Sequence, residues 1–164
     1  MKTKLLLTLL GFTSVVHASS PLTISLPGEA KSPIASGVAL PAGCALFWTS
    51  GTVPSPLNRD GKTVYERYGD TYTQGVSALK NIAEVLARQG LTLKDVVYLR
   101  VYVTPDAAKD GKPDFAGWFK AYGEFFHNEK NPARTARSTV GVAALVSPDW
   151  LIEIEAFAAY PAEK

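Results

Sequence analysis

The stretch Thr71 to Val103 reads TYTQGVSALKNIAEVLARQGLTLKDVVYLRVYV, a helix pattern followed by a strand pattern. Its first half repeats apolar residues at helical spacing: Val76, Leu79, Ile82, Ala83 and Leu86. Thr71 and Gln74 have the spacing of a capping box, and Gly90 supplies a stop. This half therefore predicts a helix with one buried face.

The second half, from Asp95 to Val103, has the period of two that is typical of a strand. One side carries Val97, Leu99, Val101 and Val103, and the other carries Val96, Tyr98, Arg100 and Tyr102. The valine and leucine side fits against helices. The opposite side is unusually aromatic for a surface in contact with water.

Further predicted elements lie on both sides of this stretch. Asp114 is placed to cap a second helix, whose aromatic stripe contains Phe115, Trp118, Phe119, Tyr122, Phe125 and Phe126. Two closing strands are expected near residues 137–143 and 151–158. Before the first helix, residues 38–40 and 45–49 are expected to pair as short strands, and residues 54–67 to form a surface loop.

This order of elements predicts an α+β sandwich, a mixed β-sheet with both helices packed on one face, formed by a single domain over residues 19–164. The other face of the sheet needs a cover. Because no third helix is predicted, the economical cover is a second copy of the chain, so we expect a closed symmetric oligomer.

Residues 1–18 have the pattern of a signal peptide: Lys2 and Lys4, an apolar run to Val16, then a small residue at Ala18. An uncleaved anchor is the alternative, but the apolar run is shorter than a membrane-spanning helix needs. We expect cleavage after Ala18 and a periplasmic or secreted protein that leaves the membrane. The remaining 146 residues carry 15 basic and 15 acidic side chains, which argues against nucleic acid as a partner.

Several kinds of site are disfavoured by composition. Cys44 is the only cysteine, so no intramolecular disulfide can form. His17 would leave with the signal peptide, and Cys44 and His127 alone do not make a zinc site. A catalytic triad would have to use His127, at a polar helix end, and no phosphate-binding glycine loop is present. We therefore expect no metal and no cofactor.

The two closing strands carry the side chains that could bind a ligand or take part in catalysis. Period-two alternation puts Arg137 with Thr139, and Glu153 with Glu155, so an arginine, a hydroxyl and two carboxylates could line one surface. Arginine suits a substrate carboxylate, and a nearby carboxylate can hold a water. From spacing alone, a solvated or structural ion pair is the favoured interpretation.

Six segments, in order between Pro33 and Ala158, resemble the RidA (YjgF) family of enamine/imine deaminases. They are Trp48 to Pro54, Gln74 with Leu79 to Ile82, Gly90 to Val97, Val101 to Val103, Ala136 to Val140, and Ile152 to Ala156. The resemblance implies a chorismate-mutase-like protomer, a homotrimer, and ligand clefts between subunits.

The resemblance also implies roles for single residues. The family's carboxylate-binding arginine corresponds to Arg137 rather than Arg134, and its water-positioning glutamate to Glu153. A backbone donor corresponds to Gly51, and the small polar residue two positions after the arginine is Thr139. Catalysis is thus assigned to Glu153 and Arg137.

Two pocket positions differ from the family pattern. Ile34 stands where family members resembling the bacterial deaminase have a tyrosine, and Phe119 stands where they have an asparagine. Phe119 also fits plain core packing. The substrate could thus be larger or less polar than usual.

The resemblance implies a hydrolase similar to 2-iminobutanoate/2-iminopropanoate deaminase, which converts imines of small carboxylates to oxo acids and ammonia. A non-catalytic trimer that binds small carboxylates is the alternative. A ribonuclease or translation inhibitor is disfavoured by the neutral charge.

Overall fold

The computed structural model describes residues 23–161, so the predicted signal peptide lies outside the described residues. Three α-helices are present: α1 (Val64–Tyr68), α2 (Thr71–Ala87) and α3 (Phe115–Phe125). Six strands accompany them: β1 (Leu46–Trp48), β2 (Val96–Val103), β3 (Pro105–Asp106), β4 (Lys112–Pro113), β5 (Ala136–Gly141) and β6 (Ile152–Ala159). Short 3₁₀ turns cover Leu93–Asp95 and Ala107–Lys109.

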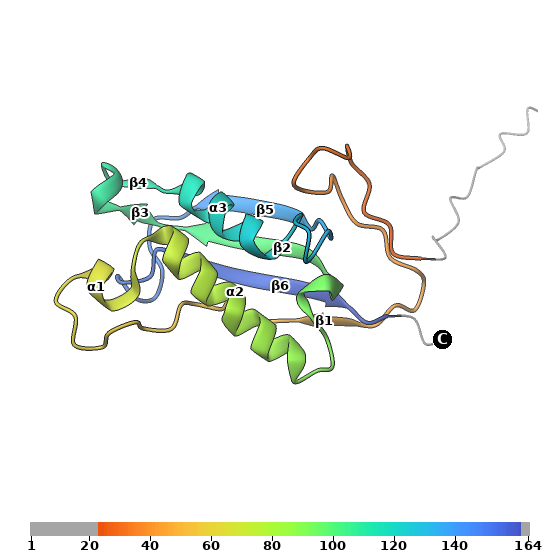
Figure 1. Ribbon diagram of the computed structural model, residues 1–164, viewed down its shortest axis with the longest axis horizontal. Coiled ribbons are helices and arrows are strands. Elements are labelled where there is room, and N and C mark those ends of the chain that lie inside the picture. The colour runs from red at the N-terminus through yellow and green to blue at the C-terminus, as the bar shows by residue number, and fades with distance from the viewer. Residues whose placement is uncertain (1–22, 162–164) are drawn as a thin grey trace, which may run out of the picture.

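The main sheet has the strand order β1-β6-β2-β5, with β3 and β4 forming a separate small hairpin. Strand β2 pairs antiparallel with β6 and parallel with β5, so the sheet is mixed. Helices α2 and α3 lie side by side across one face of it (Figure 1). The expected α+β fold, a mixed sheet with two long helices on one face, is confirmed.

The core lies between this helix layer and the sheet. Ile82, Leu99 and Ile154 have no exposed surface, and Trp118 of α3 is equally buried. A Cβ placed on Gly75 of α2 would lie only 3.0 Å from the Cβ of Ala121 of α3. The absence of a side chain at position 75 therefore allows the two helices to approach closely.

The start of α2 differs from the predicted capping box. Asp70 caps the helix, with its carboxylate accepting a 2.8 Å hydrogen bond from the Thr73 backbone N–H. Gln74 is freed to point inward, where it is fully buried. Its amide donates to the carbonyl oxygens of Gly69 and Asp149 and accepts from the N–H of Leu151, thereby tying α2 to the segment that begins β6.

The region expected to be a loop over residues 54–67 ends in a helix. Thr63 caps α1, because its hydroxyl accepts a hydrogen bond from the Glu66 N–H. Arg67 of α1 makes a two-pronged ion pair with Asp149, with nitrogen–oxygen distances of 2.5 and 2.6 Å. A single turn of helix, anchored by this pair, replaces the last part of the expected loop.

The expected pairing of residues 38–40 with 45–49 is wrong. Ala39 instead forms an isolated bridge with Ser25, whereas β1 pairs antiparallel with β6. The β6 pairing extends beyond β1, since Thr52 exchanges backbone hydrogen bonds with Ile154. The segment around Gly51 is thereby held beside β6.

The face of the sheet opposite the helices is called here the open sheet face. The register places these residues on it: Leu46, Trp48, Tyr98, Arg100, Tyr102, Ser138, Val140, Glu153, Glu155 and Phe157. Trp48 is 63% exposed and packs its ring 5.0 Å from that of Phe157. Val96, expected on this face, is buried instead, because the register shifts between Val96 and Tyr98. The described residues leave this aromatic face largely uncovered, as expected.

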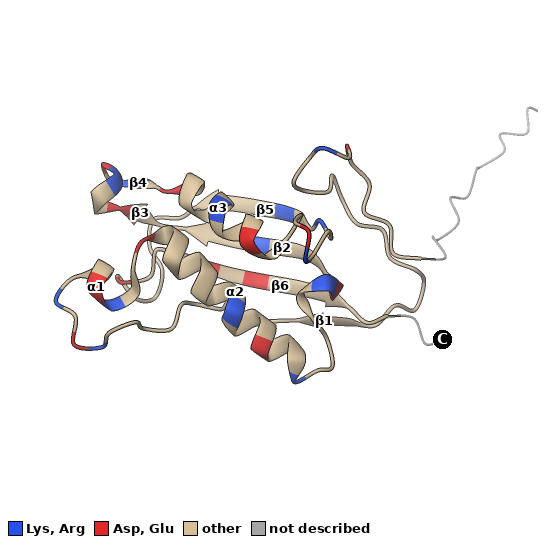
Figure 2. Ribbon diagram, viewed as in Figure 1, with Lys and Arg blue, Asp and Glu red and all other residues tan. Residues whose placement is uncertain are grey.

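Acidic and basic residues share the same elements over the described part of the chain (Figure 2). Lys80 and Glu84, for example, both lie on α2. Within residues 23–161, every helix is too short or too polar to cross a lipid bilayer.

Candidate functional site

Strand β5 presents two of the predicted site residues to the helix layer. Arg137 pairs with Leu99 and Thr139 with Val101, and both partners belong to the buried side of β2. Because alternate residues share a face, Arg137 and Thr139 point toward α3 while Ser138 and Val140 point to the open sheet face.

The Arg137 guanidinium lies against three aromatic rings of α3. Its central carbon is 4.6 Å from the centre of the Tyr122 ring, 4.8 Å from Phe119 and 5.6 Å from Trp118. Such contacts between a cation and ring faces are attractive. They hold the planar side chain in one position at the edge of the sheet.

The same guanidinium is short of polar partners. Its Nη1 is buried and has no hydrogen-bond partner among residues 23–161. Burial lowers the pKa of Arg137 from its ordinary value, and the described residues place no carboxylate in an ion pair with it. A buried donor without an acceptor costs free energy, so this position favours an anion that brings its own oxygen atoms.

Thr139 adds a hydroxyl two residues further along β5. It accepts a 3.3 Å hydrogen bond from the indole N–H of Trp118, the ring that also contacts Arg137. Arg137, Thr139 and Phe119 are called here the arginine group.

Ile34 lies on the segment next to this group. Its neighbour Pro33 accepts a hydrogen bond from the Tyr122 hydroxyl, and Ala35 donates to the Thr135 carbonyl. The half-buried Ile34 side chain packs against the core. The segment therefore borders the start of β5, two residues before Arg137.

Gly51 and Glu153 also come together, and are called here the glutamate group. A Cβ on Gly51 would lie 2.7 Å from the carboxyl carbon of Glu153 and 3.2 Å from its Cγ. Glycine at position 51 thus leaves the space that the Glu153 carboxylate occupies. The bridge between Thr52 and Ile154 sets this approach.

The two groups lie on opposite faces of the same sheet. Glu153 pairs with Tyr102, which places it on the open sheet face, whereas Arg137 and Thr139 face α3. Strand β2 also separates β5 from β6. The expectation that alternation would bring Arg137 and Glu153 to one surface is therefore wrong within a single chain, because alternation does not specify which face each set occupies.

Glu155 is engaged elsewhere. Its carboxylate forms a 3.1 Å ion pair with Arg100 and accepts a 3.1 Å hydrogen bond from the Tyr102 hydroxyl. Ser138 likewise accepts from the Tyr98 hydroxyl. For Glu155, the structural ion-pair interpretation holds, while Glu153 has no ion pair among the described residues.

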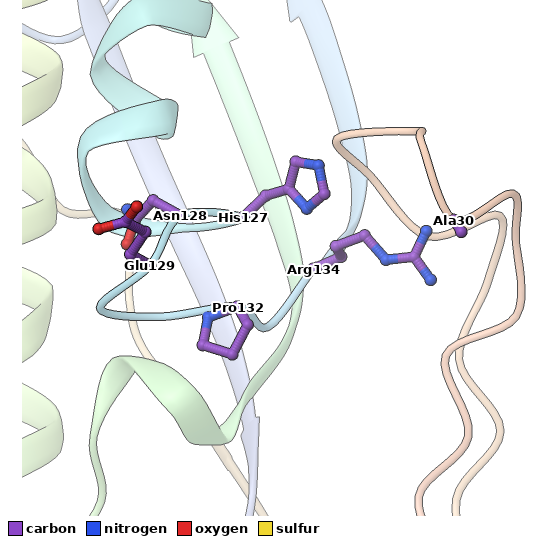
Figure 3. A pocket seen from close by; sticks show the side chains of 6 residues that line it. All are labelled: Ala30, His127, Asn128, Glu129, Pro132 and Arg134. Atoms are coloured by element: carbon purple, nitrogen blue, oxygen red, sulfur yellow. The ribbon is translucent and has the colours of Figure 1, made fainter.

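A separate open hollow of about 520 Å³ lies between the α3–β5 loop and the segment around Ala30. Figure 3 shows His127 and Arg134 on one side of it and Ala30 on the other. The Arg134 guanidinium donates to the carbonyl oxygens of Glu29 and Ser32. Because Arg134 is used in holding this loop, and none of the predicted site residues lines the hollow, Arg137 is the better candidate for a ligand.

Trp118 and Tyr122 belong to the site although the sequence pattern does not predict them there. Both are nearly fully buried, yet both contact Arg137. Their spacing along the aromatic stripe of α3 predicted a core face and gave no signal for an arginine beneath it. Among residues 23–161, no three histidine, cysteine or acidic side chains gather as a metal site would need.

Comparison with known proteins places this geometry in a family. Residues 38–160 match the family model described as Endoribonuclease L-PSP. The chain is 32% identical over 138 residues to the 3-aminoacrylate deaminase RutC of Acinetobacter baylyi, covering 84% of this chain and 98% of that protein. A RutC family protein of Pyrococcus horikoshii is 39% identical over 120 residues, 73% of this chain and 82% of its own.

Comparison with solved structures supports the same family assignment. A Rid family protein of unknown function from Yersinia pestis superposes with a TM-score of 0.63 at 27% identity, covering 85% of this chain and all of the other. The E. coli protein TdcF, solved with bound serine, gives a TM-score of 0.56 at 26% identity, over 84% and 99% of the two chains. The family thus includes a deaminase and a protein that binds a small amino acid. With three quarters of its length matched, this chain belongs to the RidA (YjgF) family, which also contains RutC.

Proposed function

We propose that the protein hydrolyses enamine or imine intermediates of small carboxylates to oxo acids, with release of ammonia. The observation that carries this proposal is the Arg137 guanidinium, buried against aromatic rings with one nitrogen lacking a partner among residues 23–161. A substrate carboxylate supplies two oxygen atoms in the plane of the guanidinium and also offsets the cost of the buried charge.

The relatives support this class of ligand. RutC of Acinetobacter baylyi is named for 3-aminoacrylate, an enamine that carries a carboxylate. TdcF was solved with serine, whose carboxylate is the kind of group that we propose Arg137 binds. In our proposal, Thr139 and the backbone of Gly51 contribute hydrogen bonds to the bound molecule.

Glu153 holds the water that reacts. An enamine first takes up a proton at carbon and loses one from nitrogen, which converts it to the imine. The water oxygen then forms a bond to the C=N carbon, one water proton passes to nitrogen, and a carbinolamine results. The hydroxyl proton then passes to nitrogen as the C–N bond breaks, which releases ammonia and leaves the C=O group of the oxo acid. Because the imine carbon is already electrophilic, water is the only co-reactant, and Glu153 acts by orienting it.

Two copies of the chain are needed for this site. The arginine group and the glutamate group occupy opposite faces of one protomer, so a cleft that contains both takes one group from each of two neighbours. A ring of three copies satisfies this, since each protomer gives one group to each neighbour. The uncovered aromatic open sheet face supports such assembly. We therefore propose a homotrimer with intersubunit clefts, which light scattering can test.

We also propose that the protein works outside the cytosol, as the sequence of residues 1–18 indicates. Mass spectrometry of the exported protein tests this through its N-terminal residue. An intact Met1 on a membrane-bound product would contradict cleavage after Ala18.

The function is tested by substituting Arg137 and Glu153. Arg137→Lys should lose most of the carboxylate affinity and most of the activity, because an ammonium does not offer paired planar donors. Glu153→Gln should keep the affinity and lower kcat, because it weakens only the hold on water. Arg134→Lys is the matched control, since that arginine bonds loop carbonyls at the separate hollow.

Calorimetry with a stable oxo acid and measurement of ammonia release, done for each variant, separate the possibilities. Normal affinity and rate in Arg137→Lys would refute the proposal. The second candidate is a carboxylate-binding protein without efficient chemistry. It is favoured by two apolar residues near Arg137, namely Ile34 and Phe119. It predicts binding that depends on Arg137, with ammonia release no faster than spontaneous hydrolysis.

A further inference from the structure

Two phenylalanines of α3 are exposed, one within the arginine group and one a helical turn before it. Phe119 is 48% exposed and Phe115 is 36% exposed, whereas Trp118 and Tyr122 of the same helix are buried. The four rings follow i, i+3, i+4 and i+7 spacing, so all of them lie toward the β5 side of α3. Large apolar rings gain free energy by leaving water, so these two rings are available for a further apolar contact.

The Phe119 and Phe115 rings lie along the side of β5 that faces the helices. The Phe119 ring lies 4.8 Å from the Arg137 guanidinium carbon. At the other end of the strand, a Cβ on Gly141 would lie 3.6 Å from Cζ of Phe115 and 3.2 Å from Cγ of Pro113. The surface beyond the guanidinium is therefore apolar, with the Thr139 hydroxyl between its two ends. A molecule whose carboxylate is held at Arg137 meets Phe119 within the reach of one side chain.

We propose that the preferred substrates are imines of 2-oxo acids with a large apolar or aromatic side chain, which packs on Phe119 and Phe115. This inference rests on the proposed function, and it names the substrate class for the same site. A methyl side chain would make little contact with these rings, whereas a benzyl or isobutyl side chain is large enough to pack on Phe119 and extend toward Phe115. An apolar pocket can discriminate between two substrates that differ by one methylene group by about tenfold or more in kcat/KM. The reaction that supplies such imines is the two-electron oxidation of an apolar α-amino acid.

The test uses imino acids generated in place by an added flavin amino-acid oxidase acting on phenylalanine, leucine or alanine. Ammonia release above the spontaneous rate gives kcat/KM for each imine. We expect kcat/KM for the phenylalanine-derived imine to exceed that for the alanine-derived imine by about tenfold. In Phe119→Ala this ratio should fall several-fold, mostly through loss on the larger substrate. Leu57→Ala is the control, because it removes another exposed apolar side chain, in the loop before α1.

Calorimetry with phenylpyruvate and pyruvate measures the same preference without turnover, and Phe119→Leu replaces Phe119→Ala if the alanine variant does not fold. A higher affinity for pyruvate than for phenylpyruvate overturns the inference, and so does a selectivity ratio that Phe119 variants leave unchanged. In either case, activity that depends on Arg137 would still support the proposed function. A change in assembly without a change in selectivity also overturns it, because Phe119 then packs against another copy. Absence of both turnover and carboxylate binding overturns the inference together with the function.

Discussion

Replacing Gly51 with alanine tests whether the Glu153 carboxylate must stay where it is. The added Cβ would lie 2.7 Å from the Glu153 carboxyl carbon, whereas ordinary contact begins at 3.4 Å. Glu153 Oε1 would lie closer still, so the carboxylate must move by more than about 1 Å. Misplacements of about 1 Å cost positioned groups about 100-fold in rate. We expect kcat for imine hydrolysis to fall by about this factor.

The fold should tolerate the same change. The obstructing atoms belong to the far end of a flexible side chain, and Gly51 does not have a positive φ. The free energy of unfolding should therefore change by no more than about 0.5 kcal/mol. Affinity for a stable oxo acid should persist, because the Arg137 clamp is not altered.

The measurements are urea unfolding, calorimetry and ammonia release on the same preparations. Gly37→Ala is the matched control, since a Cβ there meets nothing within 4 Å and its φ is not positive. A folded Gly51→Ala protein with unchanged kcat would refute the reasoning, because Glu153 would then work equally well from a displaced position.

Three further outcomes are expected. Gln74→Leu should lower the free energy of unfolding by about 3 kcal/mol in urea titrations, because it leaves buried backbone partners unpaired; the exposed Lys80→Ala on the same helix should lose far less, and equal losses would contradict this role for the amide. The hydrogen bond from Arg67 lowers the pKa of Asp149 from its ordinary value of 3.8, so the pair stabilises the fold above that pH and this contribution disappears as pH falls through the lowered pKa. Asp149→Asn should accordingly show a smaller drop in Tm on acidification than the wild type, and an equal drop would count against the ion pair. Cys44→Ser should retain full turnover, since among residues 23–161 the thiol donates hydrogen bonds to the carbonyls of Ala45 and Tyr160, neither of which is a proposed site residue; loss of ammonia release in an intact assembly would disprove the mechanism.

The elements with strong local patterns were predictable from sequence. Helix α2 and strand β2 follow from their apolar periods, and Asp114 caps α3 as expected. The capping box at Thr71 is wrong because the helix begins one residue earlier: the Asp70 carboxylate caps the Thr73 N–H, and the Gln74 N–H already donates to the Asp70 carbonyl. Helix α1 was missed because five residues carry too little periodicity to distinguish a helical turn from a loop.

Long-range arrangement was the harder part. Strand β1 pairs with β6, more than a hundred residues away, so its local neighbours gave a wrong partner. Alternation correctly grouped Arg137 with Thr139, and Glu153 with Glu155. It left open which face of the sheet each set occupies, because that depends on the order and register of the strands in three dimensions. The resemblance to the family supplied the intersubunit site that one strand pattern could not.

The Arg137 guanidinium also has a consequence for how this sequence can change. Because Arg137 is buried without an ionic partner among residues 23–161, we expect an apolar side chain of similar volume at that position to give a more stable fold in the absence of ligand. Selection for thermal resistance alone would thus discard the arginine, whereas selection for ligand capture would restore it. A bound carboxylate stabilises the folded state by mass action, so a shift in melting temperature with carboxylate concentration offers a way to search for the natural ligand without assuming any reaction.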